Sequence, residues 1–384
     1  MTTIETIALT IAAILIFPSL CRWINRPALL YSAFLLLGVL LGDFLKLDTR
    51  FMLGEVGKVG FVLLLFMVGL EIDLPPMGTL RKSFPFCLSW LFIQIPLFVL
   101  LSMYLGYGPI VGLVAGAGIN TCSLGISYSL LQSQRGIIDE TSMRKLLLAM
   151  VVLEIFALFI LALSDIFFVH GWSIKILFHS AGLVGFILLI RLFSGKIYRQ
   201  LSRLIEIEGK WKLHQTLLVL FTIAIIGDRL GLSAAKTAFF LGLFMSSTTH
   251  SGVKFEDELR PIAQNVLIPI FFIGLGSRIS IPNLFPLLLP LGIFISALLF
   301  AIRYWIFRWQ GRLEIPRRYF LLLCPNLTMV AVAAGILNEH HVAQPIIDGL
   351  LAAGLLMTIG SAFWFPSGSR IRVESSQMEL QKPI

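Results

Sequence analysis

Charged residues are too few in this chain to cover a surface that faces water. Only 13% of the 384 residues are Asp, Glu, Lys or Arg, whereas 57% are hydrophobic. A soluble domain has about 25% charged and about 45–50% apolar residues. The composition therefore excludes a soluble enzyme, a disordered chain and a nucleic-acid-binding domain, and it predicts an all-α integral membrane protein.

The apolar residues fall into segments long enough to cross a bilayer, which requires about 20 residues in a helix. Turn residues and charges separate the segments from one another. The sequence predicts thirteen transmembrane helices, at 4–20, 27–45, 55–73, 84–106, 108–131, 143–168, 174–194, 213–230, 233–249, 262–281, 284–307, 317–337 and 344–365.

Lysine and arginine concentrate in alternate loops between these helices. If the N-terminus lies outside, most of the 30 Lys and Arg residues fall on the cytoplasmic side, as the positive-inside rule requires. The C-terminus is then cytoplasmic as well. Topology thus accounts for the net charge of +9, and no nucleic acid is expected as a partner. The first segment lacks a basic start and a cleavage site, so we expect a spanning helix there.

Two stretches of sequence recur seven predicted helices apart. Residues 64–74 are similar to 271–281, and residues 32–38 are similar to 237–242. Copies separated by an odd number of helices have opposite orientations in the membrane, as in many secondary transporters. We therefore predict inverted-topology repeats. The alternative is that apolar helices look alike because of their composition.

The predicted helices 108–131 and 317–337 occupy matching positions in the two repeats, and both contain polar or helix-breaking residues. Proline removes a helix hydrogen bond, and paired interruptions of this kind point to a binding site at the membrane centre. The alternative is that small residues only allow close helix packing. The candidate site residues at the two interruptions are Asn120, Thr121, Ser123, Pro325, Asn326 and Thr328.

Three segments, 53–74, 231–242 and 259–276, resemble the membrane domain of the monovalent cation:proton antiporters. The similarity is to the branch of bacterial sodium/proton and potassium-efflux antiporters, and it extends from about Ile24 to Trp364. It implies two crossed broken helices, a core bundle and a dimerisation bundle. It also implies a homodimer in the bacterial inner membrane that exchanges a monovalent cation, Na⁺ or K⁺, for protons by an elevator mechanism. No cofactor is expected, and the metal is the transported alkali cation alone.

These features divide the chain into six parts. We expect an extra N-terminal helix at 1–23 and a first inverted repeat at 24–168. A connecting helix and cytoplasmic linker, which we expect to contact membrane lipid, follow at 169–212. The second half starts at 213–230, the second repeat occupies 231–366, and a short cytoplasmic tail occupies 367–384.

Glu154 lies well inside the predicted helix 143–168, with apolar residues for several turns on both sides. Ionisable residues within a span are costly and usually functional. Loss of hydration favours the neutral form of a carboxyl, so this group is suited to hold either a proton or a cation. The resemblance places the ion-binding acid of the family, commonly Asp, at this position. The alternative is a structural acid that pairs with Arg303.

The number of acids at this position affects how much net charge each exchange cycle moves across the membrane. Some relatives have two adjacent acids, whereas this chain has Leu153 before Glu154. One carboxyl predicts electroneutral one-for-one exchange. Arg303 is the second ionisable residue inside a span, and we expect it to pair with Glu154 or with the end of a broken helix. Asp165 is a possible acid at the outer mouth, and Asp348 is expected at a membrane boundary.

Two other functions fit the same architecture. One is a sodium-coupled organic anion transporter, which Arg303 favours and the lone acid Glu154 disfavours. The other is a channel or sensor derived from the antiporter fold, which the missing second acid permits. An enzyme is not expected, because the sequence contains no zinc-protease, nucleophile-elbow or phosphate-binding glycine motif.

Overall fold

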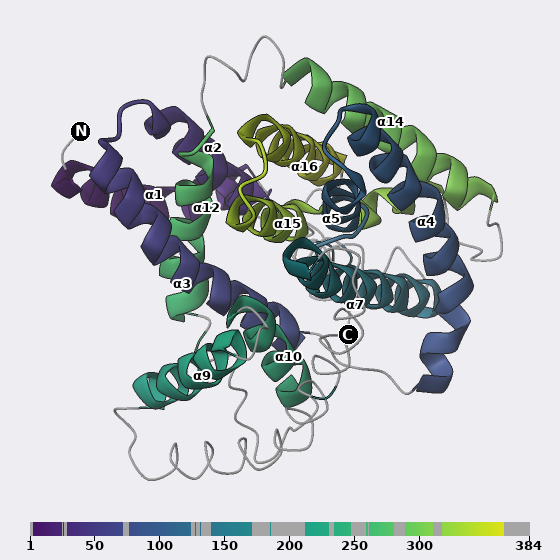
Figure 1. Ribbon diagram of the computed structural model, residues 1–384, viewed down its shortest axis with the longest axis horizontal. Coiled ribbons are helices and arrows are strands. Elements are labelled where there is room, and N and C mark those ends of the chain that lie inside the picture. The colour runs from purple at the N-terminus through teal and green to yellow at the C-terminus, as the bar shows by residue number, and fades with distance from the viewer. Residues whose placement is uncertain are drawn as a thin grey trace, which may run out of the picture.

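The computed structural model describes residues 3–24, 26, 29–71, 77–123, 127, 131, 140–170, 185, 212–229, 234–246, 259, 261–279, 289–309 and 317–364. Within these ranges every regular element is a helix, as the sequence predicts. In chain order the elements are α1 (Thr3–Trp23), α2 (Leu30–Gly42), α3 (Leu47–Glu71), α4 (Met77–Tyr104), α5 (Pro109–Ile119), α7 (Glu140–His170), α9 (Lys212–Arg229), α10 (Ala234–Ser246), the π-helical turn η2 (Ala263–Leu267), α12 (Ile268–Gly276), α14 (Leu289–Trp309), the 3-10 helix η5 (Arg317–Leu323), α15 (Leu327–Glu339) and α16 (Gln344–Trp364) (Figure 1).

Most of the predicted segments coincide with helical structure. The exception, 174–194, lies almost entirely outside the described residues, as does most of the predicted linker at 169–212. Two helices begin well before the predicted residue, α3 at Leu47 and α4 at Met77. The prediction placed the start of α3 after the charged residues Asp48 and Arg50. The helix includes them because Asp48, in the first turn, complements the helix dipole. Arg50 donates to the carbonyl oxygen of Gly42 and so is also accommodated.

Five of the described helices are long and apolar enough to cross a membrane. They are Ile4–Trp23, Pro85–Tyr104, Gly292–Trp309, Tyr319–Glu339 and Gln344–Trp364. Their outward faces carry large apolar side chains, among them Phe92 at 68% exposure and Trp305 at 55%. Such faces would be unfavourable in water, and a bilayer supplies the apolar surroundings that they require.

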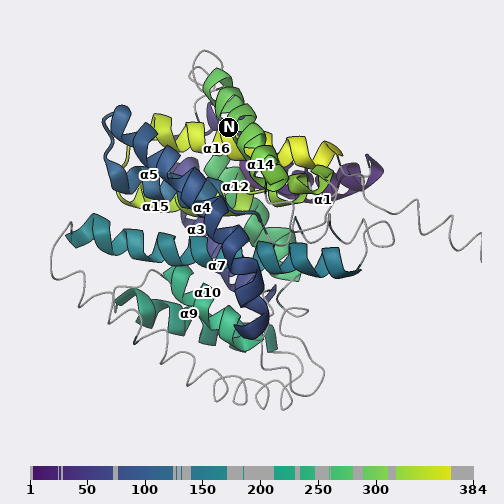
Figure 2. The ribbon, with the colours of Figure 1, turned by 90° about the vertical axis from the view of Figure 1, so that its right-hand side faces the viewer.

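The helices pack into two groups, which lie side by side in Figure 1 and overlap in the view of Figure 2. In the first group α3 packs against α10 and α12, α2 packs against α12, and α9 packs against α10. In the second group α5 lies among α4, α7 and α15, while α16 packs against α14 and α15. The few contacts between the groups include those of α16 with α2.

Close backbone contact joins α2 to α12. A Cβ atom at Gly38 would overlap the carbonyl oxygen of Ile273, and one at Gly276 would overlap that of Leu35. A glycine on each helix therefore allows the two backbones to touch, as at small-residue crossings of membrane helices.

The contact between α10 and α3 repeats this arrangement. A Cβ atom at Gly242 would overlap the carbonyl oxygen of Phe66, and one at Gly69 would overlap that of Phe239. In both crossings each glycine faces the residue three positions before its partner glycine. The matching geometry involves the same four stretches of sequence that show internal similarity.

Replacement of Gly276 or Gly242 by alanine should destabilise the protein. The added methyl group meets backbone atoms that have no rotamer to change, and overpacking of this kind costs about 1–3 kcal/mol. We expect a melting temperature several degrees lower in detergent, followed by tryptophan fluorescence.

The matched control for these variants is Gly335→Ala in α15, where the nearest atom to an added Cβ is 3.7 Å away. Alanine is favoured over glycine in a helix, so the control should keep or raise the melting temperature. Equal melting temperatures for all three variants would contradict the proposed role of the crossings.

Candidate functional site

The first interruption follows α5. The helix ends at Ile119, the amide of Asn120 still donates to Gly116 at 3.0 Å, and Thr121, Cys122 and Ser123 are not helical. Glycine has low helix propensity, so Gly116 and Gly118 weaken the last turns of α5. All four residues from Asn120 to Ser123 are at most 1% exposed. The chain thus leaves its helix within the protein interior.

The second interruption separates η5 from α15. Residues Cys324, Pro325 and Asn326 are non-helical, and α15 starts at Leu327. Proline cannot donate the hydrogen bond that would continue a helix, and its ring clashes with the preceding turn. The segment before the proline is a 3-10 helix of seven residues, longer than is usual for this conformation.

Direct hydrogen bonds connect the two interruptions. The amide of Ser123 donates to the carbonyl of Pro325 at 2.5 Å, and the side-chain amide of Asn326 donates to the carbonyl of Ile119 at 2.6 Å. The hydroxyl groups of Ser123 and Thr328 lie 2.5 Å apart. The structure thus brings the two interruptions into direct contact.

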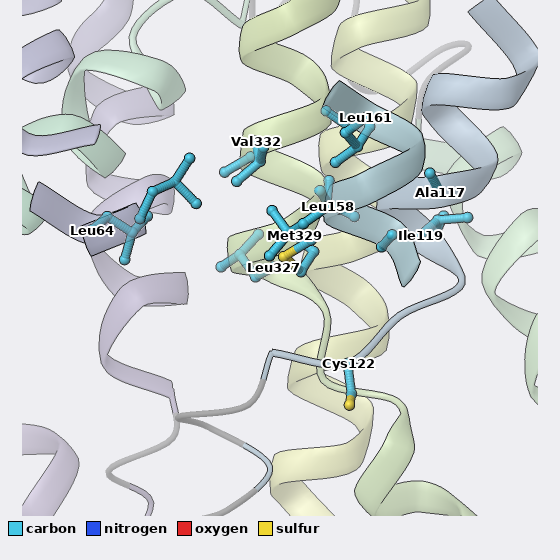
Figure 3. Close-up of a cluster of buried hydrophobic side chains, with 14 of the residues drawn as sticks. Leu64, Ala117, Ile119, Cys122, Leu158, Leu161, Leu327, Met329 and Val332 are labelled. Atoms are coloured by element: carbon cyan, nitrogen blue, oxygen red, sulfur yellow. The ribbon is translucent and has the colours of Figure 1, made fainter. Parts of the chain in front are cut away.

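Apolar side chains surround these contacts. Figure 3 shows Leu158 of α7 beside Leu327 and Met329 at the start of α15, with Ile119 at the end of α5. Cys122 lies in the extended segment that follows α5, and its thiol is 3.9 Å from the carbonyl oxygen of Met150 in α7. The polar atoms of both interruptions are thus enclosed in a dry environment, where each unsatisfied group is expensive.

Arg303 on α14 bridges the C-terminal ends of both broken segments. Its guanidinium donates to the carbonyl of Ile119 at 2.5 Å and to that of Leu323 at 3.3 Å. These are the last residues of α5 and η5, where helix dipoles place partial negative charge. Arg303 is fully buried. The sequence predicts that Arg303 pairs with Glu154 or with the end of a broken helix. The structure places it in contact with two such helix ends.

Two residues that the sequence analysis did not single out complete this contact. Gln94 accepts from Arg303 at 3.1 Å, and the ring of Trp90 lies 5.3 Å from its guanidinium carbon. The indole N–H of Trp90 also donates to the carbonyl of Asn120 at 2.8 Å. Both residues are fully buried on α4. Gln94 could have been singled out from the sequence, because it is a polar residue within an apolar stretch of helix.

The candidate cation ligands differ in their bonding. Thr121 bonds back to α5, with its hydroxyl 3.1 Å from the carbonyl of Gly118. By contrast, the side-chain amide of Asn120 and the side-chain oxygen of Asn326 are buried and have no hydrogen-bond partner among the described residues. Buried polar groups are normally bonded. Oxygen atoms of this kind suit a hard alkali cation.

Glu154 is fully buried on α7. It lies one helical turn after Met150, whose carbonyl is the neighbour of Cys122 in the first interruption. The carboxyl therefore belongs to the helix that packs against the broken segment. Asp165 lies eleven residues further along α7, and its side chain is outside the described residues.

Thr358 on α16 is a third residue that the sequence analysis missed. It is fully buried, and its hydroxyl oxygen accepts from the amides of Asn326 and Leu327, both at 3.2 Å. Leu323 lies 204 residues after Ile119, and Thr358 lies 204 residues after Glu154. This common offset was the signal that could have found Thr358.

Two other features lie away from the interruptions. Asp348, which is expected at a membrane boundary, lies in the first turns of α16, is 2% exposed and accepts from Gln344 at 2.8 Å. A cavity of about 190 Å³ lies among α1, α2 and the start of α12, with Arg22 and Asn265 in its lining. Neither is in contact with the groups described above.

A membrane bundle in which two interrupted helices meet around buried ionisable and amide groups has the architecture of a secondary transporter. The sequence pattern described as "Sodium/hydrogen exchanger, transmembrane" matches residues 7–367. The chain therefore belongs to the sodium/hydrogen exchanger family, and it is an integral membrane protein.

Relatives and a solved structure agree with this assignment. The chain is 25% identical over 289 residues to the probable Na⁺/H⁺ antiporter 3 of Methanocaldococcus jannaschii. The alignment covers 72% of this chain and 72% of that relative. It is 26% identical over 366 residues to the putative Na⁺/H⁺ antiporter YjbQ of Bacillus subtilis, covering 86% of this chain and 56% of that relative. The fold matches that of the sodium proton antiporter MjNhaP1 of Methanocaldococcus jannaschii, with a TM-score of 0.69, 16% identity, and coverage of 94% and 96% of the two chains.

Replacement of Arg303 by methionine should destabilise the protein strongly. The variant leaves the carbonyl of Leu323 and the side-chain oxygen of Gln94 without the donor that Arg303 supplies, and it removes one of the two donors to the carbonyl of Ile119. Each buried unsatisfied group costs about 1–3 kcal/mol. Thermal unfolding in detergent measures the effect. Arg308→Gln, on the same helix but exposed, is the control and should unfold like the wild type. An Arg303→Met variant as stable as that control would contradict the bridging role.

Proposed function

We propose that this protein exchanges a monovalent cation, Na⁺ or K⁺, for protons at the two helix interruptions, with Glu154 as the carboxylate that holds either ion. The observation that carries the proposal is that the side-chain amide of Asn120 and the side-chain oxygen of Asn326 are buried where two broken helices meet and have no hydrogen-bond partner among the described residues. Family membership and the relatives' names support the same activity.

Each proposed ligand has a chemical reason. A dehydrated alkali cation needs several oxygen ligands and a compensating negative charge. Glu154 supplies the charge when it is ionised, and the neutral oxygens of Asn120, Thr121, Ser123 and Asn326 supply polar coordination. When Glu154 takes up a proton it loses that charge, and the cation is released. Binding of the two ions is therefore mutually exclusive.

Arg303 has a structural rather than a substrate-binding role in this proposal. All three of its nitrogen atoms donate to protein groups, namely Gln94, Leu323 and Ile119. It is thus engaged with the negative ends of α5 and η5, where it also keeps positive charge near the cation site. Because the guanidinium is already bound to protein groups, the organic anion alternative, which would use this arginine to bind substrate, is disfavoured.

The proposal extends to the way in which the two groups of helices are arranged and move in the membrane. The two helix groups correspond to a core bundle that contains α5 and α15 and a dimerisation bundle that contains α3 and α10. The paired glycine crossings support inverted repeats, which fits thirteen transmembrane helices with the N-terminus outside. We propose a homodimer in a bacterial inner membrane in which the core moves as an elevator against the other bundle.

Substitution Glu154→Gln should abolish cation-dependent proton movement. Glutamine keeps the size of the side chain but can hold neither a proton nor a compensating charge. Proteoliposomes that contain a pH-sensitive dye and receive Na⁺, K⁺ or Li⁺ in turn provide the measurement.

Glu55→Gln is the matched control for this variant. Glu55 is half exposed and pairs with Lys58 at 2.8 Å, so the same chemical change there should leave transport intact. Glu154→Asp keeps a carboxyl and should retain part of the activity. Undiminished transport by Glu154→Gln would contradict the assignment, whereas no transport by the wild type with any cation would favour a channel or sensor.

Exchange through one carboxyl should be electroneutral. One positive charge then binds in each half-cycle, so the rate should not depend on an imposed membrane potential. Valinomycin with K⁺ gradients sets the potential while Na⁺-driven proton movement is followed. A rate that rises or falls steeply with the potential would show that a second charge participates.

A further inference from the structure

Thr358 lies where the N-terminal end of α15 needs acceptors. The first amides of a helix have no partner in the helix itself, and they carry partial positive charge. In α15 these amides belong to Asn326, Leu327 and Thr328, all within the protein interior. The hydroxyl of Thr358 accepts from the first two at 3.2 Å, and that of Ser123 accepts from the third at 3.1 Å.

The residue that Thr358 holds is one of the proposed cation ligands. Asn326 is fixed at two atoms, because its backbone amide donates to Thr358 and its side-chain amide donates to Ile119. These two bonds leave the side-chain oxygen of Asn326 without a hydrogen-bond partner in the part of the chain that the structure describes. The position of that oxygen therefore depends on the contact with Thr358.

Thr358 also corresponds to Glu154 in the internal repeat. The two residues are 204 positions apart, the same separation as between Ile119 and Leu323, whose carbonyls both bind Arg303. Gly38 and Gly242 of the two close crossings are separated by 204 residues as well, and the other pair, Gly69 and Gly276, by 207. One half of the site thus has a carboxyl at this position and the other half has a hydroxyl.

We propose that Thr358 is a positioning residue for the cation: it caps the start of α15 with a neutral group and so holds the side-chain oxygen of Asn326 toward the cation. A hydroxyl at this place satisfies the two amides without adding charge, which leaves Glu154 to carry the exchangeable charge. This inference rests on the proposed function and names a further determinant of cation affinity in the same site.

Thr358→Val tests the proposal, because valine has nearly the same shape and cannot accept a hydrogen bond. We expect the apparent KM for Na⁺ in proteoliposomes to rise about fivefold to tenfold, the size expected for one lost buried hydrogen bond. The maximal rate at saturating Na⁺ should change less than twofold. Thr358→Ser restores the hydroxyl and should restore the wild-type KM.

Ser361→Ala is the matched control. Ser361 is fully buried on the same helix, and its hydroxyl donates to the carbonyls of Met357 and Thr358 within α16. Its removal deletes a buried hydroxyl without touching α15, so the KM should stay at the wild-type value. A wild-type KM in Thr358→Val, or an equal rise in Ser361→Ala, would overturn the proposal.

Hydrogen exchange separates this proposal from the proposed function. In the purified protein, Thr358→Val should speed amide exchange in a peptide that covers Asn326 and Leu327, and Ser361→Ala should not. Unchanged exchange in Thr358→Val would overturn the capping role even if the wild type transports cations. Faster exchange in Thr358→Val, together with a wild-type protein that moves no protons, would refute the proposed function while the capping role stands.

Discussion

The structure depends on the satisfaction of helix ends inside a membrane protein. Two helices stop in the interior, at Ile119 and Leu323, and a helix end exposes backbone groups that hydrocarbon cannot satisfy. Arg303 provides donors for both carbonyl ends, and Thr358 provides an acceptor for the amides that restart α15. Because these partners come from α14 and α16, the interruptions determine how the surrounding helices must pack.

We propose that the same arrangement prepares a cation site. Polar groups that are bonded to one another stabilise the interruptions, whereas the side-chain oxygens of Asn120 and Asn326 have no hydrogen-bond partner among the described residues and suit a cation. Glu154 adds a carboxyl on the helix next to them. In the proposed mechanism a cation and a proton compete for that carboxyl, and alternating access of the shared site to the two membrane sides couples their movements.

Much of this could be predicted from sequence. The shortage of charge predicts helices in a membrane, Pro325 predicts the second interruption, and an acid inside an apolar segment identifies Glu154. The partners of the interruptions could not be found in this way. Gln94 and Thr358 are unremarkable polar residues whose importance comes from contacts with other segments: Gln94 contacts Arg303, 209 residues away, and Thr358 contacts Asn326, 32 residues away. Only the three-dimensional packing, or the 204-residue offset between the repeats, brings them together with the site.

Proton release on cation binding tests the central claim most directly. Purified protein in weakly buffered detergent solution is titrated with Na⁺ or K⁺ near neutral pH, while a pH indicator follows released protons and calorimetry follows binding. If Glu154 is the shared site, each cation that binds displaces up to one proton, and Glu154→Gln loses the release together with tight binding. Cation binding without proton release, or an unchanged release in Glu154→Gln, would contradict the account.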